Sequence, residues 1–509
     1  MKTTSDNIDI APASPKEIRT VVTGLILALM LASLDQNIVG VALPRIVSDL
    51  GGLKHISWVV TAFMVTSTAT TPLYGKLSDM YGRKPLFIGA IFIFLAGSIF
   101  CGLSRSMAQL VLFRGIQGAG AGGLMTLAMT TIADLVPPRE RGRYQGFFGA
   151  TFAFSSIAGP LLGGFITSAL SWHWIFFVNL PIGLLALAFF IFGFHRVHHK
   201  VVHRIDYAGV FYLTFSTVSL LLVLSMGGVQ YPWSSPIIAG LCVFVAVMVA
   251  LLISNERGSA EPIFPPDLFR NRVFVIATGT MAITFMGLFG AAVFLPLFFQ
   301  LVLGYAPAKA GLLMAPMTVG VVISSFTGGR LVTRTGKYKR YPVIGLAAAS
   351  LSFLFIMTAS SLKLGIGLIE ISLVILGLGF GLVMPNLMVA IQNAVNPLKI
   401  GAATATSAYF RSLGGTFGVA LSGAIMSVQL HGVQASTLPQ TGSRALILEQ
   451  GIQEILQLSP ERRDAVIAIY RYAINTTFLV GAIITALAFL LVLNLPELPL
   501  RSGRPSAEG

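Results

Sequence analysis

One carboxylic acid stands inside the first long apolar stretch of the chain, where water cannot solvate it. Asp35 lies within residues 21–44, a run long enough to cross a bilayer as a helix. A rise of roughly 1.5 Å per residue, counted back from Pro44, puts Asp35 about 13 Å below the outer membrane boundary. Ionisable groups at such depth are costly and usually serve a function. Asp35 is therefore the first candidate for proton chemistry.

A basic residue is expected at nearly the same depth in the fourth apolar run. The same count from Met107 puts Arg114 about 10 Å below the outer boundary. Burial favours the neutral form of a carboxyl group, whereas a nearby guanidinium favours the charged form. A carboxyl balanced between these effects can bind and release a proton, so we expect Asp35 and Arg114 to serve proton coupling. The alternative is a static buried pair, or an Asp35 side chain that snorkels to the interface.

The composition indicates that lipid surrounds these helices. Of the 509 residues, 55% are hydrophobic and only 10% are charged, whereas soluble proteins carry roughly a quarter charged residues. The net charge of +15 comes from Lys and Arg in short segments between apolar runs, which is typical of cytoplasmic membrane loops and argues against nucleic-acid binding. Cys101 and Cys242 lie in apolar runs without metal-ligand spacing, so we predict no metal site.

Runs of about 20 apolar residues predict about fourteen transmembrane helices in an all-α integral membrane protein. The predicted spans are 21–43, 57–75, 86–104, 108–133, 144–168, 174–194, 207–227, 236–254, 273–302, 309–332, 342–360, 364–391, 402–428 and 470–495. Lys and Arg concentrate in alternate loops, at 76–84, 139–143, 196–204, 257–272 and 330–340. The positive-inside rule therefore predicts that both termini are cytoplasmic.

A weak internal echo suggests two related halves. Gly75-Lys76-Leu77 follows the second span and Gly329-Arg330-Leu331 follows the tenth, with Gly82 and Gly336 seven positions after each first glycine. The echo fits two six-helix bundles with an extra central helix pair. Chance similarity is the alternative. The predicted organisation is a tail 1–20, a bundle 21–194, an inserted pair 207–254, a bundle 273–495 with a long outer loop 429–469, and a tail 496–509. Within that loop, 445–458 could form an amphipathic helix at the outer interface.

Two further segments carry unusual residues for membrane helices. Glycines allow the loop at 75–85 to turn tightly, and its Asp79 could sit against a helix N-terminus or a basic partner. Gly159-Pro160 interrupts the fifth span, because proline removes a backbone hydrogen bond and kinks a helix. A purely structural kink is the alternative to a functional bend there.

Five motifs in order resemble the major facilitator superfamily, and specifically its fourteen-span drug:proton antiporters. They are the 34–44 stretch of the first span, the 75–85 loop, Arg114-Gly115-Ile116-Gln117-Gly118, Gly159-Pro160-Leu161-Leu162-Gly163-Gly164, and the 172–181 stretch, where His173 replaces the usual arginine. The resemblance covers about residues 20–495. It implies an inner gate built on Gly75, Asp79, Gly82, Arg83 and Asp134, with an ordinary solvated turn as the alternative.

The same resemblance implies that Gly159, Pro160, Gly163 and Gly164 form a bend that controls leak and direction. Polar residues expected near the membrane centre are candidates for a central cavity, with packing roles equally open: Asn37, Gln117, Asn386 and Arg411. Residues 118–123 match G-x-G-x-x-G, but no strand precedes them, so the segment is better interpreted as a helix-packing face.

The sequence therefore predicts a transporter and not an enzyme. We find no Walker A loop and no nucleophile motif, so the expected energy source is a proton gradient and no cofactor is required. The resemblance implies multidrug efflux of amphipathic, often cationic molecules from a bacterial inner membrane, as in antibiotic resistance. A dedicated exporter of one metabolite or siderophore is the alternative, followed by a sensor that has lost transport. The expected partners are a small-molecule substrate, protons and the lipid bilayer, and the sequence leaves open whether a periplasmic adaptor takes part.

Overall fold

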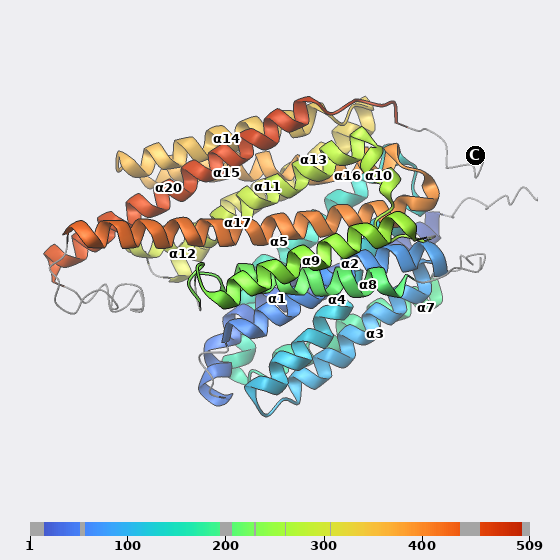
Figure 1. The fold of residues 1–509 in the computed structure, drawn as a ribbon, viewed down its shortest axis with the longest axis horizontal. Coiled ribbons are helices and arrows are strands. Elements are labelled where there is room, and N and C mark those ends of the chain that lie inside the picture. The colour runs from blue at the N-terminus through green and yellow to red at the C-terminus, as the bar shows by residue number, and fades with distance from the viewer. Residues whose placement is uncertain are drawn as a thin grey trace, which may run out of the picture.

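The fold is built from long helices that run roughly parallel to one another (Figure 1). The computed structural model describes residues 15–50, 56–193, 206–228, 231–259, 261–305, 307–437 and 459–500. Within these ranges no β-strand occurs, and only an isolated bridge joins Gly227 and Tyr231. The prediction of an all-α protein is confirmed.

Eleven helical segments of the described chain are long and apolar enough to cross a membrane. Three other long helices, α2 (Ile56–Tyr81), α4 (Met107–Leu135) and α17 (Ile400–Thr437), do not belong to that set. These three pack against one another, and they carry Gly, Ser and Thr where a lipid-facing helix would carry apolar side chains. The described segments are consistent with the fourteen predicted spans.

The N-terminal bundle packs closely because glycines remove side chains from its helix contacts. A β-carbon on Gly118 of α4 would lie 2.4 Å from the Phe63 carbonyl oxygen of α2, and one on Gly120 would lie 2.5 Å from the Phe94 nitrogen of α3. The segment 118–123 is therefore a helix-packing face, as predicted. The other helices of this bundle are α1 (Pro15–Leu50), α3 (Arg83–Gly102), α5 (Pro138–Ala169), α6 (Trp174–Phe177) and α7 (Asn179–Gly193).

The C-terminal bundle lies beside the first one, in the upper part of Figure 1. It contains α17 and the segments α10 (Pro266–Arg270), α11 (Arg272–Leu297), η2 (Phe298–Val302), α12 (Pro307–Leu313), α13 (Ala315–Thr335), α14 (Arg340–Ser361), α15 (Ile366–Gly381), α16 (Met384–Ala394), η3 (Pro397–Lys399) and α20 (Pro460–Leu493). The two bundles meet along α2 and α17 on one side and along α5 and α13 on the other.

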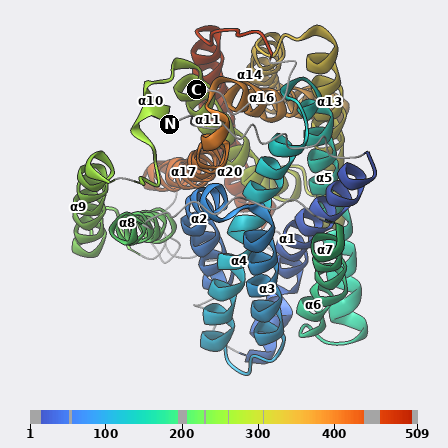
Figure 2. The ribbon, with the colours of Figure 1, turned by 90° about the vertical axis from the view of Figure 1, so that its right-hand side faces the viewer.

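The inserted pair, α8 (Tyr207–Met226) and α9 (Pro236–Gly258), lies at the periphery, as the view along the helices shows (Figure 2). Helix α8 packs against α2 and α17, and Thr217 shares a 2.7 Å hydrogen bond with the Tyr409 hydroxyl of α17. Most of α9 is exposed and apolar, which suits a helix that faces lipid. The pair therefore covers the seam between the bundles on one side.

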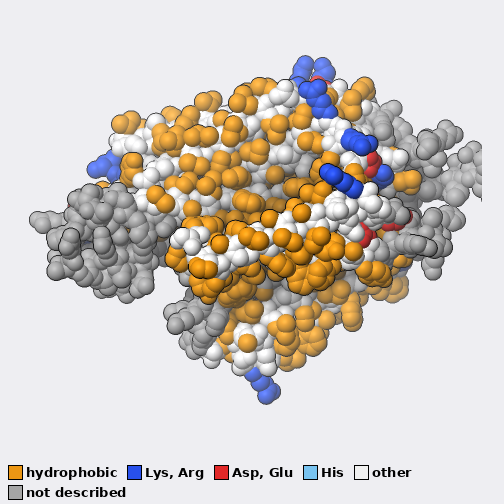
Figure 3. All heavy atoms as spheres, in the orientation of Figure 1, with side chains coloured by type: hydrophobic (Ala, Val, Ile, Leu, Met, Phe, Trp, Pro, Cys, Tyr) orange, Lys and Arg blue, Asp and Glu red, His pale blue; other side chains and the backbone are white. Residues whose placement is uncertain are grey.

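Charge is concentrated at one end of the molecule. Figure 3 shows a broad apolar surface along the helices, with most visible Lys and Arg side chains at the right-hand end. The first described residues of α1 and the last of α20 lie at that same end (Figure 1). We take it as the inner end, following the positive-inside rule. The predicted basic loop at 196–204 lies outside the described residues.

The predicted outer loop 429–469 is helical at both of its described ends. Helix α17 continues to Thr437 and α20 begins at Pro460, so both helices extend beyond the apolar runs. Residues outside the hydrocarbon region can remain helical without being apolar, so apolar runs mark the membrane spans and not the full lengths of these helices. The amphipathic segment predicted at 445–458 lies outside the described residues.

Candidate functional site

The structure brings Asp35 and Arg114 into direct contact inside the N-terminal bundle. Arg114 Nη1 lies 2.5 Å from Asp35 Oδ2, and the two side chains are 1% and 0% exposed. The other carboxylate oxygen accepts hydrogen bonds from Gln117 Nε2 at 2.9 Å and Asn179 Nδ2 at 2.8 Å. Gln117 and Asn179 also reach Ser98 Oγ of α3. Asp35 thus has polar partners on α4 and α7, which compensate for its removal from water.

Arg114 is also held by several groups of the same bundle. Its Nε donates to the Val59 carbonyl oxygen at 3.2 Å, and Nη1 donates to Gln117 Oε1 at 2.7 Å. The guanidinium carbon lies 4.1 Å from the centroid of the Phe63 ring, a cation–π contact. All these contacts come from the N-terminal bundle, so the Asp35 network can move as part of one rigid body.

The glycines of α5 pack on α1 next to this network. A β-carbon on Gly159 would lie 2.4 Å from Cβ of Asn37, and one on Gly163 would lie 2.9 Å from the Ile38 carbonyl oxygen. Pro160 is exposed, and a β-carbon on Gly164 would meet nothing within 4 Å. Close approach of α5 to α1 therefore requires Gly159 and Gly163, whereas Gly164 has no such role in this conformation.

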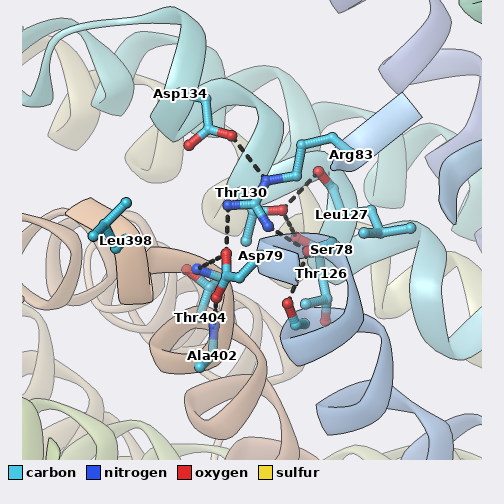
Figure 4. A network of polar contacts seen from close by, with 12 residues as sticks. Ser78, Asp79, Arg83, Thr126, Leu127, Thr130, Asp134, Leu398, Ala402 and Thr404 are labelled. Atoms are coloured by element: carbon cyan, nitrogen blue, oxygen red, sulfur yellow. Dashed lines mark hydrogen bonds and ion pairs between the residues drawn. The ribbon is translucent and has the colours of Figure 1, made fainter. Parts of the chain in front are cut away.

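The end of α2, the start of α3 and the end of α4 form a charge cluster at the inner end (Figure 4). Arg83 lies between two carboxylates, with Nη2 2.7 Å from Asp79 Oδ1 and Nε 2.8 Å from Asp134 Oδ2. Arg83 Nη1 also donates to Ser78 Oγ. Gly82, between α2 and α3, has a φ of 89°, a conformation that only glycine adopts readily. The residues implied for an inner gate thus lie together.

Asp79 connects this cluster to the C-terminal bundle. Its carboxylate accepts hydrogen bonds from the backbone N–H groups of Gly401 at 3.1 Å and Ala402 at 2.7 Å, at the start of α17. Those N–H groups have no partner within the helix, and the helix dipole favours an anion there. Asp79 therefore has both partners considered from the sequence, a helix N-terminus and an arginine.

The inner ends of the bundles meet through small residues at two related places. A β-carbon on Gly75 would lie 2.1 Å from Cβ of Ala405, and one on Gly329 would lie 2.0 Å from the Gly142 carbonyl oxygen. Gly75 and Gly329 are the first glycines of the internal echo. Its later glycines, Gly82 and Gly336, both have positive φ values, 89° and 71°. Equivalent positions thus have equivalent roles in the two halves, which favours true internal repetition over chance similarity.

The four cavity candidates differ in where they lie. Gln117 and Asn386 are both fully buried; the Gln117 amide bonds with Asp35, Arg114 and Ser98, and Asn386 Nδ2 donates to the Leu382 carbonyl oxygen at 2.6 Å. Both amides are therefore enclosed by protein in this conformation. Asn37 and Arg411 are partly exposed.

Asn179 is the functional candidate that sequence reasoning missed. It is fully buried and donates to Asp35, although it lies far from Asp35 in the chain. A polar amide just before the apolar run of α7 was the available signal. The sequence contains no comparable signal for Ser98, because a serine in a membrane helix commonly bonds its own backbone.

Comparison with known proteins agrees with this architecture. The family model of the Major Facilitator Superfamily matches residues 25–419. The multidrug transporter protein MdtP of Bacillus subtilis is 39% identical over 80% of this chain and 75% of its own length. Multidrug resistance protein 3 of the same organism is 38% identical over 82% of each chain.

Solved structures show the same fold at low sequence identity. The human organic anion transporter MFSD10 superposes with a TM-score of 0.61 at 16% identity, covering 94% of this chain and 100% of that chain. The proton:xylose symporter XylE superposes with a TM-score of 0.62 at 15% identity, covering 94% and 96%. These neighbours are transporters and not enzymes. The chain is a multi-pass membrane transporter that belongs to the major facilitator superfamily.

Proposed function

We propose that this protein exports amphipathic small molecules, cationic ones among them, in exchange for protons. The observation that carries the proposal is the Asp35 carboxylate, fully buried within the membrane-spanning part of the N-terminal bundle. Its partners Arg114, Gln117 and Asn179 offset the loss of water around the carboxylate. A proton on Asp35 would remove the charge attraction to Arg114 and weaken the hydrogen bonds that the carboxylate accepts.

Transport by alternating access requires a second conformation. In the described one, Asp79 and Gly75 join the bundles at the inner end, and Asp35 has no exposed surface. We infer that protons reach Asp35 from the outer side as the bundles rock, and leave to the cytoplasm after the inner contacts open. Each charge moved across 100 mV supplies about 2.3 kcal/mol, sufficient for a substrate gradient of about fifty-fold.

The names of the relatives favour broad efflux but leave a second candidate. Two Bacillus proteins at 38–39% identity are called multidrug proteins. A transporter of the acurin A biosynthesis cluster from Aspergillus aculeatus is 31% identical over 84% of this chain, which supports a dedicated exporter of one metabolite. Efflux of several unrelated dyes would favour the multidrug function. We also propose that the protein lies in a bacterial inner membrane.

The test is proton-driven transport of ethidium into inside-out vesicles. Imposing an acidic interior should drive uptake by the wild type, and substrate addition should accelerate dissipation of the proton gradient. Asp35→Asn should abolish both signals because its side chain no longer binds a proton. Glu370→Gln is the matched control, since Glu370 is a partly exposed carboxyl of α15 without a salt bridge to any described residue. Substrate-linked proton movement that survives Asp35→Asn would remove the coupling assignment.

A further inference from the structure

Arg411 is a cation about three turns into α17. Its described hydrogen-bond partners are both sulfur atoms. Nη2 lies 3.0 Å from Sδ of Met125 and Nη1 lies 3.3 Å from Sδ of Met384. The guanidinium carbon lies 5.0 Å from the centroid of the Phe285 ring. A thioether is a weak acceptor, and a guanidinium carries five N–H donors. The contacts therefore leave much of the hydrogen-bonding capacity of Arg411 unused.

The contrast with Arg114 is informative. Arg114 is paired with Asp35 and bonded to two further oxygens, as expected for a buried arginine that has its counter-ion. Among the described residues, no carboxylate forms a salt bridge with Arg411. An intramembrane arginine is costly and normally pairs with an anion or with carbonyl groups. The described protein supplies neither to Arg411, which suggests that the anion comes from a ligand.

Arg411 also lies where the two bundles face each other. Met125 belongs to α4 of the N-terminal bundle, whereas Met384 and Phe285 belong to α16 and α11 of the C-terminal bundle. The neighbouring Ser412 shares a 2.9 Å hydrogen bond with Thr68 of α2 across the same seam. Substrate sites of such transporters lie at the interface between repeats near the midplane. Methionine and phenylalanine side chains there offer a soft, apolar surface beside the charge.

We propose that Arg411 binds an anionic group of the transported molecule, a carboxylate or sulfonate, while Met125, Met384 and Phe285 contact its apolar part. The substrate range would then include anionic and zwitterionic amphipathic molecules as well as cationic ones. The inference rests on the proposed efflux function, because it names a substrate class for that same transport. Arginine suits this role because its planar fork binds such oxyanions with two hydrogen bonds.

Two dyes with one apolar skeleton test the role of the charge. Anilinonaphthalene sulfonate carries a sulfonate, and phenylnaphthylamine is its neutral counterpart. Their dissociation constants are measured by equilibrium dialysis against the purified protein in nanodiscs, with empty nanodiscs as background. The variants are Arg411→Gln and Arg411→Lys, and Arg105→Gln is the control, because Arg105 is exposed between α3 and α4. Size-exclusion profiles verify that each variant is folded.

Arg411→Gln should raise the dissociation constant of the sulfonate dye by about tenfold or more, while that of the neutral dye changes less than about twofold. Arg411→Lys should retain sulfonate binding within a few-fold, since it keeps the charge, and Arg105→Gln should change neither dye. Equal changes for both dyes, or no change for the sulfonate, would overturn the inference. Because binding is measured without a proton gradient, this result is independent of the Asp35 transport test, whose failure alone would reject proton-driven efflux.

Discussion

Replacing Asp79 by asparagine tests the contact that holds the inner ends of the bundles together. Asp79 accepts hydrogen bonds from the N–H groups of Gly401 and Ala402 at 3.1 and 2.7 Å. An amide has one oxygen for these two donors and no charge to interact with the helix dipole. Hydrogen bonds to charged groups contribute roughly 1.5–3 kcal/mol against 0.5–1.5 for neutral ones. We therefore expect the inner-closed state to lose about 2 kcal/mol, a shift of about 30-fold in the ratio of states.

A cysteine at position 325 reports this shift without requiring transport. Ser325 of α13 is 5% exposed, and a β-carbon on Gly149 of α5 would lie 2.9 Å from its hydroxyl oxygen. Opening of the inner side would expose it. With Cys101 and Cys242 replaced by alanine, the rate at which a membrane-impermeant maleimide labels Ser325→Cys in inside-out vesicles measures the open fraction. Asp79→Asn should accelerate labelling by about 30-fold, provided that exchange is faster than labelling.

Asp134→Asn is the matched control for this measurement. Asp134 accepts from Arg83 at 2.8 Å, and both residues belong to the N-terminal bundle. Removing that charge breaks no described contact between the bundles, so labelling should change less than about threefold. An unchanged labelling rate in Asp79→Asn would refute the reasoning, and so would equal acceleration in both variants.

Two further predictions concern the membrane-buried network. Gly159→Ala should lower both transport and the melting temperature in detergent, whereas Gly164→Ala should change neither, because only the first β-carbon meets α1, 2.4 Å from Cβ of Asn37; equal effects would contradict the packing argument. Asp35→Asn should destabilise the protein by about 3–5 kcal/mol, because Arg114 then remains buried without its counter-ion, and adding Arg114→Met should recover part of that loss. Unfolding free energies in mixed micelles check this, and strictly additive losses would count against the pair.

Hydropathy predicted most of the fold because lipid-facing helices have to be apolar. It located α2, α4 and α17 as well, although these central helices carry many Gly, Ser and Thr residues. It does not locate the ends of helices that continue beyond the hydrocarbon region, as at the end of α17 and the start of α20. The sequence contains no signal for that difference, since a polar segment can be a loop or a solvated helix.

Some residues of the candidate site could be predicted from their own position in the sequence, without knowledge of their partners. An acid within an apolar run identified Asp35, and depth counting put Arg114 near it. The identity of distant partners was not predictable. Asn179 reaches Asp35, and Gly401 reaches Asp79, across separations of 144 and 322 residues. Such contacts depend on how the helices are arranged around each other, which periodicity within one helix does not specify.

The Asp35 network and the inner gate differ in the partners that each involves, and this difference constrains how protons could drive transport. Every described partner of Asp35 belongs to the N-terminal bundle, so protonation breaks no described contact between the bundles directly. Asp79, in contrast, binds the start of α17. Helix α4 contacts both places, through Arg114 at one and Asp134 at the other, twenty residues or about 30 Å apart.

Charges that far apart interact weakly, so any coupling has to be mechanical. The helix is suited to transmit movement, because glycines within 118–123 hold its middle part tightly against α2 and α3. Release of Arg114 by a protonated Asp35 would then tilt α4 as a rod and displace the Arg83 cluster that orients Asp79. Introducing Asp35→Asn into the Ser325→Cys reporter measures this coupling. A labelling rate equal to that of the parent would show that the two sites act independently.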